Sequence, residues 1–549
     1  MKSRRNVLSA ALALTGAAAV SRSATPPQSA TAAATHYPGD LREIGLIAND
    51  PAAATSNTTA LKALVDPAGK FRGNLCFPNT TGNDTYFFND IIPFHDGISL
   101  DLQGCVLHFS KAGVRADTCC GFIFAIRDFL IANGSIVVDY QTGGGGVDAG
   151  NALTFGNRAE HSRYFSPLYD SMLPTPMGNI TVRNLRIFSN TKGGIGIYMI
   201  GGLNGVIMEN VWLDGSGALD YGIYYEFGWA TNEPKRELRQ TSHAYNMRFS
   251  NINISNMNAE KGSAFTLNGA YNCWIDGLYV RVAKILFGCG PGESGFYRPW
   301  KGVDQVGAKR NIALRNVVGV GITGTAISIG GASSKSGGYL GVTQNTARDQ
   351  TDLIDFSIDG FAIDGANRDG GFGIHSSAEK IDLRNGRITN FTRGVVTTHD
   401  CTRMTIDSVD IFGCTACGMQ IGQNSSIWNP PRAKMGVIRS CFIAGNGISD
   451  PGKFAAIELD LCTGFLIECN RFGYEAAHDG IDETNQGFAV RVGAQSHNVV
   501  CRCNHIAGVS SGGIAYVNLA GSDARGNSIY NSSGASSLRG SWNGTTEAN

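Results

Sequence analysis

The stretch Asn179-Ile180-Thr181-Val182-Arg183-Asn184-Leu185-Arg186-Ile187 indicates the fold, because its pattern recurs along most of the chain. Each copy has an apolar residue, a polar residue and then Asn, Gly, Ser or Cys, followed by a second alternating apolar segment. The third residues are often 23 to 29 positions apart, which is the self-similarity expected of a solenoid. Further copies are centred on Gln103, Ala132, Glu209, Ser250, Asp276, Arg315, Asp359, Arg384, Asp407, Arg439, Glu468, Arg502 and Arg525.

Strand alternation places residues two apart on one face. Val182 and Leu185 can therefore both face the interior only if the chain bends near Asn184. Asn and small residues tolerate the left-handed backbone that such a bend needs. One unit cannot bury its own apolar face, whereas stacked units pair each strand in parallel with its counterpart one turn along. The pattern predicts an all-β fold, a single-stranded right-handed parallel β-helix with an N-terminal capping helix and inserted loops.

Composition argues against several other classes. The chain of 549 residues has 72 Gly, 27 Phe and 16% charged residues, with a formal net charge of zero. A zero net charge gives no support to nucleic-acid binding. No amphipathic helix of about 10–15 residues lies between the strands, which argues against a βαβ fold. A leucine-rich repeat would need a Leu-rich consensus and helical segments, and neither is found. Because a solenoid lengthens by adding turns, we expect one long domain.

The N-terminal segment has the features of an export signal. Arg4 and Arg5 precede an apolar stretch from Val7 to Val20, and residues 3–8 resemble the twin-arginine signal. The stretch is too short to span a membrane, and no other segment is a candidate span. A basic start before an Ala-rich tail is the alternative. We expect a signal peptide at 1–24, a linker at 25–39, the β-helix at 40–530 and a polar tail at 531–549, in a bacterial protein exported to the periplasm or beyond.

One helix is predicted, at Asn57–Val65, with Asn57 or Thr58 as its N-cap. A helix at this position would cover the open first turn of the solenoid.

The chain has 14 cysteines, of which eight follow residue 400. Cys414 and Cys417 have the spacing of a redox or zinc motif, but no matching second pair follows. Stacked turns would bury most of the cysteines above one another as small apolar residues. Disulfides and a metal site are the alternatives.

Function is expected where loops interrupt the repeat. The longest insertions fall around residues 139–178, 214–246, 281–310 and 319–352 and are rich in aromatic residues. Aromatic faces suit the C–H faces of sugar rings, although the same residues can pack the loops onto the β-helix. From these loops we select Trp229, Arg236, Arg298 and Trp300 as substrate-binding candidates.

A second strand in each repeat contributes outward-facing residues to a polar column, the expected floor of a cleft. Four of its members are further substrate-binding candidates, namely Tyr198, Tyr224, Asn268 and His375. The other members are Glu226, Thr266, Ser328, Gln420, Glu458 and Arg491.

Asp220 and Glu226 bracket one of these strands, and glycoside hydrolysis needs two carboxylates. His243 and Lys261 would add the base and the cation that β-elimination or C5 epimerisation of a uronic acid needs. These four residues are the catalytic candidates. For each, a solvated charge or a rung-to-rung ion pair is the alternative. No metal site and no cofactor are predicted, with calcium implied only for a lyase.

Residues 40–109 resemble the start of the pectate-lyase-like superfamily of right-handed parallel β-helices. The resemblance rests on the order of a strand, the capping helix, Leu75-Cys76-Phe77-Pro78 and Gly97-Ile98-Ser99-Leu100-Asp101-Leu102. Asp220-Tyr221 stands where polygalacturonases have two aspartates, and Phe372-Gly373-Ile374 stands where they have Gly-His-Gly. The calcium-binding Asp cluster of pectate lyases and the Tyr-Gly-Phe-Asp-Pro-His phrase of alginate epimerases are not found. The resemblance implies a carbohydrate-handling protein without specifying its reaction.

The sequence therefore predicts an exported enzyme that cleaves a polysaccharide, as a hydrolase or a lyase. A non-catalytic glycan-binding surface protein and a uronate C5-epimerase are the alternatives. The expected partner is a polysaccharide or an oligosaccharide, with no nucleic acid. The sequence does not decide the oligomeric state.

Overall fold

The structure is a computed structural model. The chain consists of two units, residues 1–37 and Pro38–Asn549. The described residues are 41–65, 73–94, 97–110, 121–124, 128–139, 150–156, 177–200, 203–226, 244–289, 310–329, 354–366, 371–376, 378–398, 401–423, 433–473, 485–510, 512–516, 522–530 and 538–539. The expected signal peptide and linker lie outside these residues and stay predictions.

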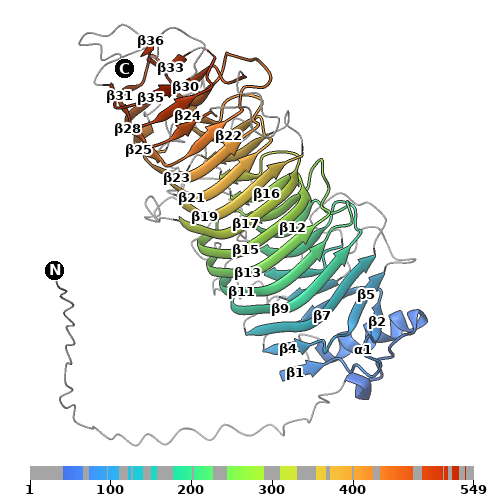
Figure 1. The fold of residues 1–549 in the computed structure, drawn as a ribbon. Coiled ribbons are helices and arrows are strands. Elements are labelled where there is room, and N and C mark those ends of the chain that lie inside the picture. Colours follow the sequence, from blue (N-terminus) through green and yellow to red (C-terminus); the bar gives the residue numbers. More distant parts are fainter. Residues whose placement is uncertain are drawn as a thin grey trace, which may run out of the picture. The chain divides into compact units, whose positions relative to one another are not determined.

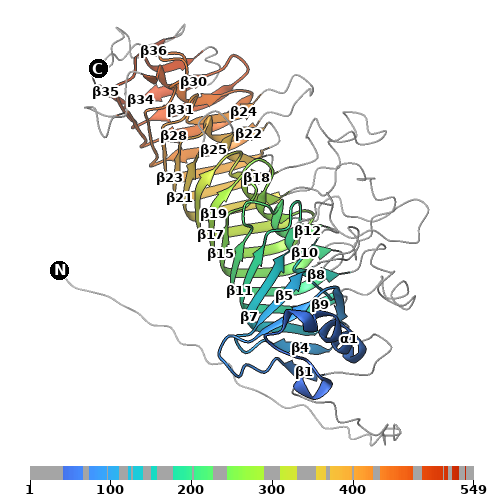
Figure 2. The same ribbon diagram turned by 90° about the vertical axis from the view of Figure 1, so that its right-hand side faces the viewer.

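Two long sheets of parallel strands form the fold, as the sequence predicted, and they run side by side along the β-helix (Figures 1 and 2). The 21-stranded sheet contains β1 (Gly73–Cys76), β2 (Thr85–Phe88), β4 (Ile98–Asp101), β5 (Val106–Ser110), β7 (Phe129–Asp139), β9 (Met177–Ser189), β11 (Leu203–Asp214), β13 (Tyr245–Ser255), β15 (Tyr271–Ala283), β17 (Arg310–Ile322), β19 (Ile354–Gly365), β21 (Lys380–Thr389), β23 (Arg403–Phe412), β25 (Ala433–Arg439), β26 (Phe442–Ala444), β28 (Cys462–Glu468), β29 (Arg471–Phe472), β31 (His497–Arg502), β32 (His505–Ala507), β34 (Asp523–Arg525) and β35 (Ser528–Tyr530).

The 15-stranded sheet contains β3 (Ile91–Phe94), β6 (Gly121–Phe124), β8 (Leu153–Gly156), β10 (Ile195–Ile200), β12 (Tyr221–Glu226), β14 (Ser263–Leu267), β16 (Ile285–Cys289), β18 (Ile327–Ile329), β20 (Phe372–Ser376), β22 (Arg393–Thr398), β24 (Met419–Gln423), β27 (Ala455–Leu459), β30 (Phe488–Val492), β33 (Gly512–Tyr516) and β36 (Leu538–Arg539). One turn of the chain, here called a rung, contributes one strand to the 15-stranded sheet and either one long strand or two short strands to the 21-stranded sheet. Strand β36 pairs with β33 and lies within the segment predicted to be a tail, so the rungs continue past residue 530.

The predicted bend is present in the long strands of the 21-stranded sheet. Asn184 has a φ of 49°, Asn210 of 54° and Asn251 of 51°, which are left-handed values. The bend allows Val182 and Leu185 to be fully buried on either side of it. Later bends keep a positive φ with other residues, including Gly360, Ser408, Ser440, Cys469 and Cys503.

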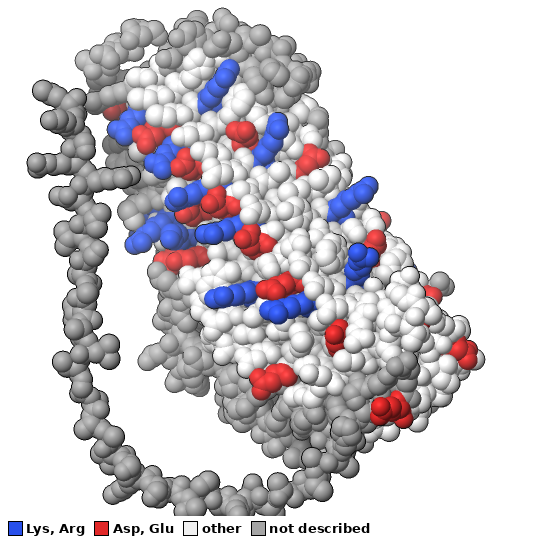
Figure 3. All heavy atoms as spheres, turned by 60° about the horizontal axis from the view of Figure 1, so that its bottom comes forward, with Lys and Arg blue, Asp and Glu red and all other residues white. Residues whose placement is uncertain are grey.

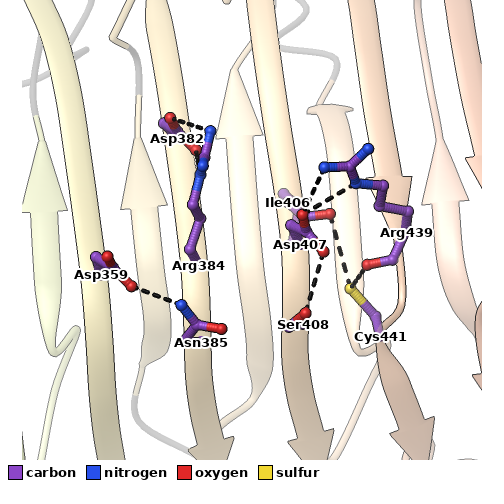
Figure 4. Close-up of polar contacts among 9 residues, drawn as sticks. All are labelled: Asp359, Asp382, Arg384, Asn385, Ile406, Asp407, Ser408, Arg439 and Cys441. Atoms are coloured by element: carbon purple, nitrogen blue, oxygen red, sulfur yellow. Dashed lines mark hydrogen bonds and ion pairs between the residues drawn. The ribbon is translucent and has the colours of Figure 1, made fainter. Parts of the chain in front are cut away.

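Side chains at the bend are stacked from rung to rung. The Nδ2 of Asn184 donates to Oδ1 of Asn133 at 2.9 Å, Asn210 donates to Asn184 at 2.9 Å, and Asn251 donates to Asn210 at 2.8 Å. Farther along, Asn385 donates to Asp359 at 2.7 Å (Figure 4). The ladder satisfies side-chain polar groups that the stacking brings together, and it fixes the register of the rungs.

The residue before each bend faces outward and forms a charged column. In register, the column contains Arg183, Glu209, Ser250, Asp276, Arg315, Asp359, Arg384, Asp407, Arg439, Glu468 and Arg502. Arg439 lies 2.8 Å from Asp407 (Figure 4). Arg502 lies 2.8 Å from Glu468. Figure 3 shows charges of both signs interspersed along one face of the molecule. Exposed pairs of this kind contribute at most about 1 kcal/mol each, so their main effect is to favour one register.

The capping helix is α1 (Ala54–Val65), which contacts β2 and β3. The N-cap prediction is wrong, because a 3₁₀ turn at Pro51–Ala53 precedes α1 and Asp50 caps it by accepting from the Ala52 amide. Asn57 is fully buried, and its side-chain amide forms hydrogen bonds with the backbone of Ile47 and Phe87 instead.

Twelve cysteines lie among the described residues as thiols. Most are buried, as the stacking pattern predicted, whereas Cys469 and Cys503 occupy bends and are exposed. Burial raises the pKa of the Cys441 thiol to about 12, so this thiol is protonated at neutral pH. The described residues contain no cluster of three or more metal-ligating side chains.

We expect Asn210→Ala to lower the free energy of unfolding by about 2–3 kcal/mol, because it removes two ladder hydrogen bonds and places a Cβ at a left-handed position. Asn210→Gly removes the same bonds without that conformational cost, so its loss should be about 1 kcal/mol smaller. Urea unfolding of the two variants measures the difference. Equal losses would contradict the role assigned to the backbone conformation.

The carboxylate of Asp84 fastens the N-terminal cap to the first rungs. It accepts from Thr80, Thr81 and Asn49, and these hydrogen bonds hold its pKa well below the ordinary value. A lowered pKa in the folded state stabilises the fold above the unfolded-state pKa of about 3.9, and this stabilisation is lost as the pH falls further.

We therefore expect Asp84→Asn to reduce the melting temperature at pH 7 and to reduce it less at pH 2–3. Thermal unfolding of both proteins across this range measures the gap. A gap that stays constant from pH 7 to pH 2 would show that the carboxylate charge is not responsible.

Candidate functional site

The predicted polar column is present on the outer face of the 15-stranded sheet. Strand register aligns Thr154, Tyr198, Tyr224, Thr266, Gly288, Ser328, His375, Val396, Gln420, Glu458 and Arg491. Sequence alternation therefore predicted most of this column, with Glu226 and Asn268 as the exceptions. Glu226 and Asn268 lie two residues farther along the sequence than Tyr224 and Thr266, which are the column members of their strands.

Two tyrosines of this column do not form an open cleft floor. The exposed fraction of Tyr198 is 0% and that of Tyr224 is 7%. Their rings stack with centroids 5.7 Å apart, and Tyr221 packs on Tyr224 at 4.4 Å. With Ile195 they form a hydrophobic cluster, and Asn268 donates to the Tyr224 hydroxyl at 3.5 Å. The ring faces that were expected to contact substrate are used for packing.

The two candidate carboxylates lie at opposite ends of β12. Asp220 precedes the strand and Glu226 ends it, so about 20 Å of extended chain separates their Cα atoms. Glycoside hydrolysis needs carboxyl groups about 5–9.5 Å apart, which excludes these two as a pair. Asp220 accepts from Asn258 at 3.2 Å in the turn, and Lys261 is exposed in the turn of the next rung. His243, Trp229, Arg236, Arg298 and Trp300 lie outside the described residues.

An open groove of about 780 Å³ lies on the other sheet, on the outward face of the segments that follow the bends. Two adjacent columns line it. The first contains Ser135, Arg186, Trp212, Asn253, Tyr279 and Val318, and the second contains Val137, Phe188, Asp214, Ser255, Arg281 and Val320. No pattern in the sequence predicted this groove.

Three aromatic residues of the groove are unusually exposed for a sheet surface. The exposed fractions are 41% for Phe188, 39% for Trp212 and 42% for Tyr279. Trp212 and Tyr279 share a column two strands apart, which separates them by about 10 Å. The guanidinium carbon of Arg186 lies 5.8 Å from the Trp212 ring centroid and restricts the indole. Exposed apolar patches of this kind mark interaction sites.

Polar side chains alternate with these rings. Arg186 and Asn253 flank Trp212 in its column, and Arg281 lies in the adjacent one. Asp214 is the one carboxylate among the described groove residues. Both of its oxygens already accept hydrogen bonds in the turn, from the Ser216 amide at 2.8 Å and from Asn256 at 2.9 Å.

Trp274 provides an internal comparison. It lies before the bend on β15, outside the groove, and is 42% exposed. Arg248 lies 5.5 Å from its ring centroid, so the contact resembles that of Arg186 with Trp212. The two tryptophans thus match in exposure and in their arginine contact, and they differ in whether they line the groove.

The chain has no match among protein-family models or among curated proteins. Solved structures give weak similarities. They include the A-module of mannuronan C-5 epimerase AlgE6 from Azotobacter vinelandii, with 11% identity over 89% of this chain and 99% of that chain and a TM-score of 0.38. They also include PfbA, a surface adhesin of Streptococcus pneumoniae, with 11% identity, 90% coverage of both chains and a TM-score of 0.36. A tailspike protein of E. coli bacteriophage HK620 in complex with a pentasaccharide has 11% identity, 88% and 78% coverage and a TM-score of 0.42. At these identities and TM-scores, the assignments made for this chain rest on its own geometry.

Proposed function

We propose that the protein binds an extended polysaccharide in the groove of the 21-stranded sheet. The observation that carries the proposal is the aromatic surface of Phe188, Trp212 and Tyr279, spread over neighbouring rungs of a rigid sheet. Because the rungs repeat every 4.7–4.9 Å, a linear polymer can lie across several of them and repeat the same contacts.

A sugar chain fits both the rings and the polar groups of the groove. The C–H faces of sugar rings stack on aromatic faces, and the hydroxyl groups need hydrogen-bonding partners. Asn253 and Ser255 stand between the aromatic strands and can donate and accept hydrogen bonds. Arg186 and Arg281 add donors at either end of this polar set.

The described groove supports binding more directly than cleavage. A hydrolase needs two carboxyl groups near one bond, whereas Asp214 is the one carboxylate among the described lining residues. Asp220 and Glu226 are too far apart to act as a pair on one glycosidic bond. Individual roles of Asp220, Glu226, His243 and Lys261 in a hydrolase, lyase or epimerase stay predictions. The substrate-binding roles expected for Trp229, Arg236, Arg298 and Trp300, which lie outside the described residues, also stay predictions.

We further propose that the protein works outside the cytoplasm, because the basic start and apolar stretch of residues 2–20 resemble an export signal. Among the described residues, no helix is long and apolar enough to cross a membrane.

Affinity electrophoresis in gels containing alginate, polygalacturonate, xylan or dextran tests the binding. We expect at least one of these polysaccharides to retard the protein. Trp212→Ala and Tyr279→Ala should each weaken binding by roughly tenfold, since an aromatic stacking contact contributes about 0.5–1.5 kcal/mol beyond its buried area.

Trp274→Ala is the matched control and should bind as tightly as the unmodified protein. Equal losses in Trp212→Ala and Trp274→Ala, or no retardation by any polysaccharide, would contradict the proposal. Assaying the same mixtures for new reducing ends and for ultraviolet absorbance tests the enzymatic prediction, because hydrolysis gives the first alone and elimination gives both.

A further inference from the structure

The outer face of the 15-stranded sheet carries a second cluster, far along the chain from the groove residues. It spans strands β20, β22, β24, β27 and β30. Phe372 is in register with Arg393, and the polar column continues beside them. The cluster consists of Phe372, His375, Arg393, Gln420, Glu458 and Arg491.

Arg393 has a buried donor without an acceptor. Its guanidinium carbon lies 5.8 Å from the Phe372 ring centroid, so the ring covers one side of the group. Its Nε is buried and makes no hydrogen bond. The rest of the half-buried guanidinium interacts with the Cys417 thiol, and among the described residues no carboxylate forms an ion pair with it. A buried charged donor without a partner is costly, and such a group calls for an explanation by a ligand or ion.

The neighbours of Arg393 bring no spare negative charge. Glu458 is 6% exposed, and its Oε1 lies 2.6 Å from Arg491, which already neutralises it. Burial raises the pKa of the adjacent Cys417 thiol, so this group is protonated. Burial lowers the pKa of His375 from 6.5, so its neutral form predominates at pH 7. The cluster as a whole therefore carries one positive charge in excess.

Gln420 lies on β24, the strand next to β22, and it lacks a hydrogen-bond donor. Its Oε1 is buried and accepts no hydrogen bond. The cluster thus offers an unused charged donor and an unused neutral acceptor on neighbouring strands. A complementary ligand would present a carboxylate for the donor and a hydroxyl for the acceptor.

We propose that Arg393 and Gln420 form a binding site for a sugar acid, with the carboxylate on Arg393 and a hydroxyl donating to Gln420. The site is separate from the groove and lies on the other sheet. Its residues can therefore be substituted without changing Trp212 or Tyr279. If no sugar acid binds at this site, the proposal for the groove is unaffected.

Calorimetric titration of the protein with glucuronate, galacturonate and glucose tests this site. We expect both sugar acids to bind and glucose not to bind. Arg393→Met should weaken the binding of the sugar acids by about tenfold to a hundredfold, the range for a charge-assisted hydrogen bond. It should change the melting temperature little, because Met can keep the apolar contact with Phe372 and no described carboxylate pairs with the charge that is removed.

Arg387→Met is the matched control. Arg387 also stacks on a phenylalanine, 5.1 Å from the centroid of Phe412, but it is exposed and has no orphaned nitrogen. This variant should bind sugar acids normally. Gln420→Leu should weaken glucuronate binding and leave the binding of acetate unchanged, because acetate carries no hydroxyl.

Oligogalacturonate and maltohexaose distinguish the source of the sugar acid. Binding of free glucuronate supports a single sugar acid as ligand, and binding of oligogalacturonate alone supports a chain-borne carboxylate. The proposal is overturned if neither acid binds more tightly than its neutral counterpart. It is also overturned if Arg393→Met binds normally, or if Arg387→Met loses as much affinity.

Discussion

The left-handed bend in the long strands is the constraint on which the rest of the structure depends. A bend at Asn184 and its equivalents directs the apolar residues on both of its sides into one interior. Stacking the bends brings the Asn side chains into hydrogen-bond contact from rung to rung. A shift of one residue in the strand register would break that ladder and turn the interior residues outward, so the register is strongly specified.

A fixed register turns sequence positions into columns on the surface. The residue before the bend forms the charged column from Arg183 to Arg502, in which opposite charges face each other at several rungs. The residues after the bend form the two groove columns, in which rings and polar side chains alternate. Both candidate binding surfaces follow from this geometry, because each is a set of outward residues that the rungs hold at fixed spacing. Rigid spacing favours a polymer as ligand, since little ordering of the protein is needed on binding.

Most of the fold could be predicted from the sequence, because the bend has local causes. Asn and Gly tolerate a positive φ, and alternation marks the inward faces. The polar column on the other sheet was predicted for the same reason. The N-cap was misplaced because Asn57 bonds Ile47 and Phe87, a tertiary contact that local sequence does not show.

The groove was missed because an outward Trp212 or Tyr279 contradicts the usual inward preference of aromatic residues. The available sequence signal was a large ring at a position that alternation assigns to the outside. Asp220 and Glu226 appeared close because they are near in sequence, but an extended strand separates them. Proximity along the chain was therefore no evidence that the two carboxylates act as a pair.

Oxidative footprinting of the tryptophans with and without bound polysaccharide tests the central claim most directly. Trp212 and Trp274 are nearly equally exposed, so both should be oxidised at similar rates in the unbound protein. A polysaccharide that lies in the groove should protect Trp212 and leave Trp274 unprotected. Equal protection of the two, or protection of Trp274 alone, would contradict the assignment of the groove as the glycan-binding site.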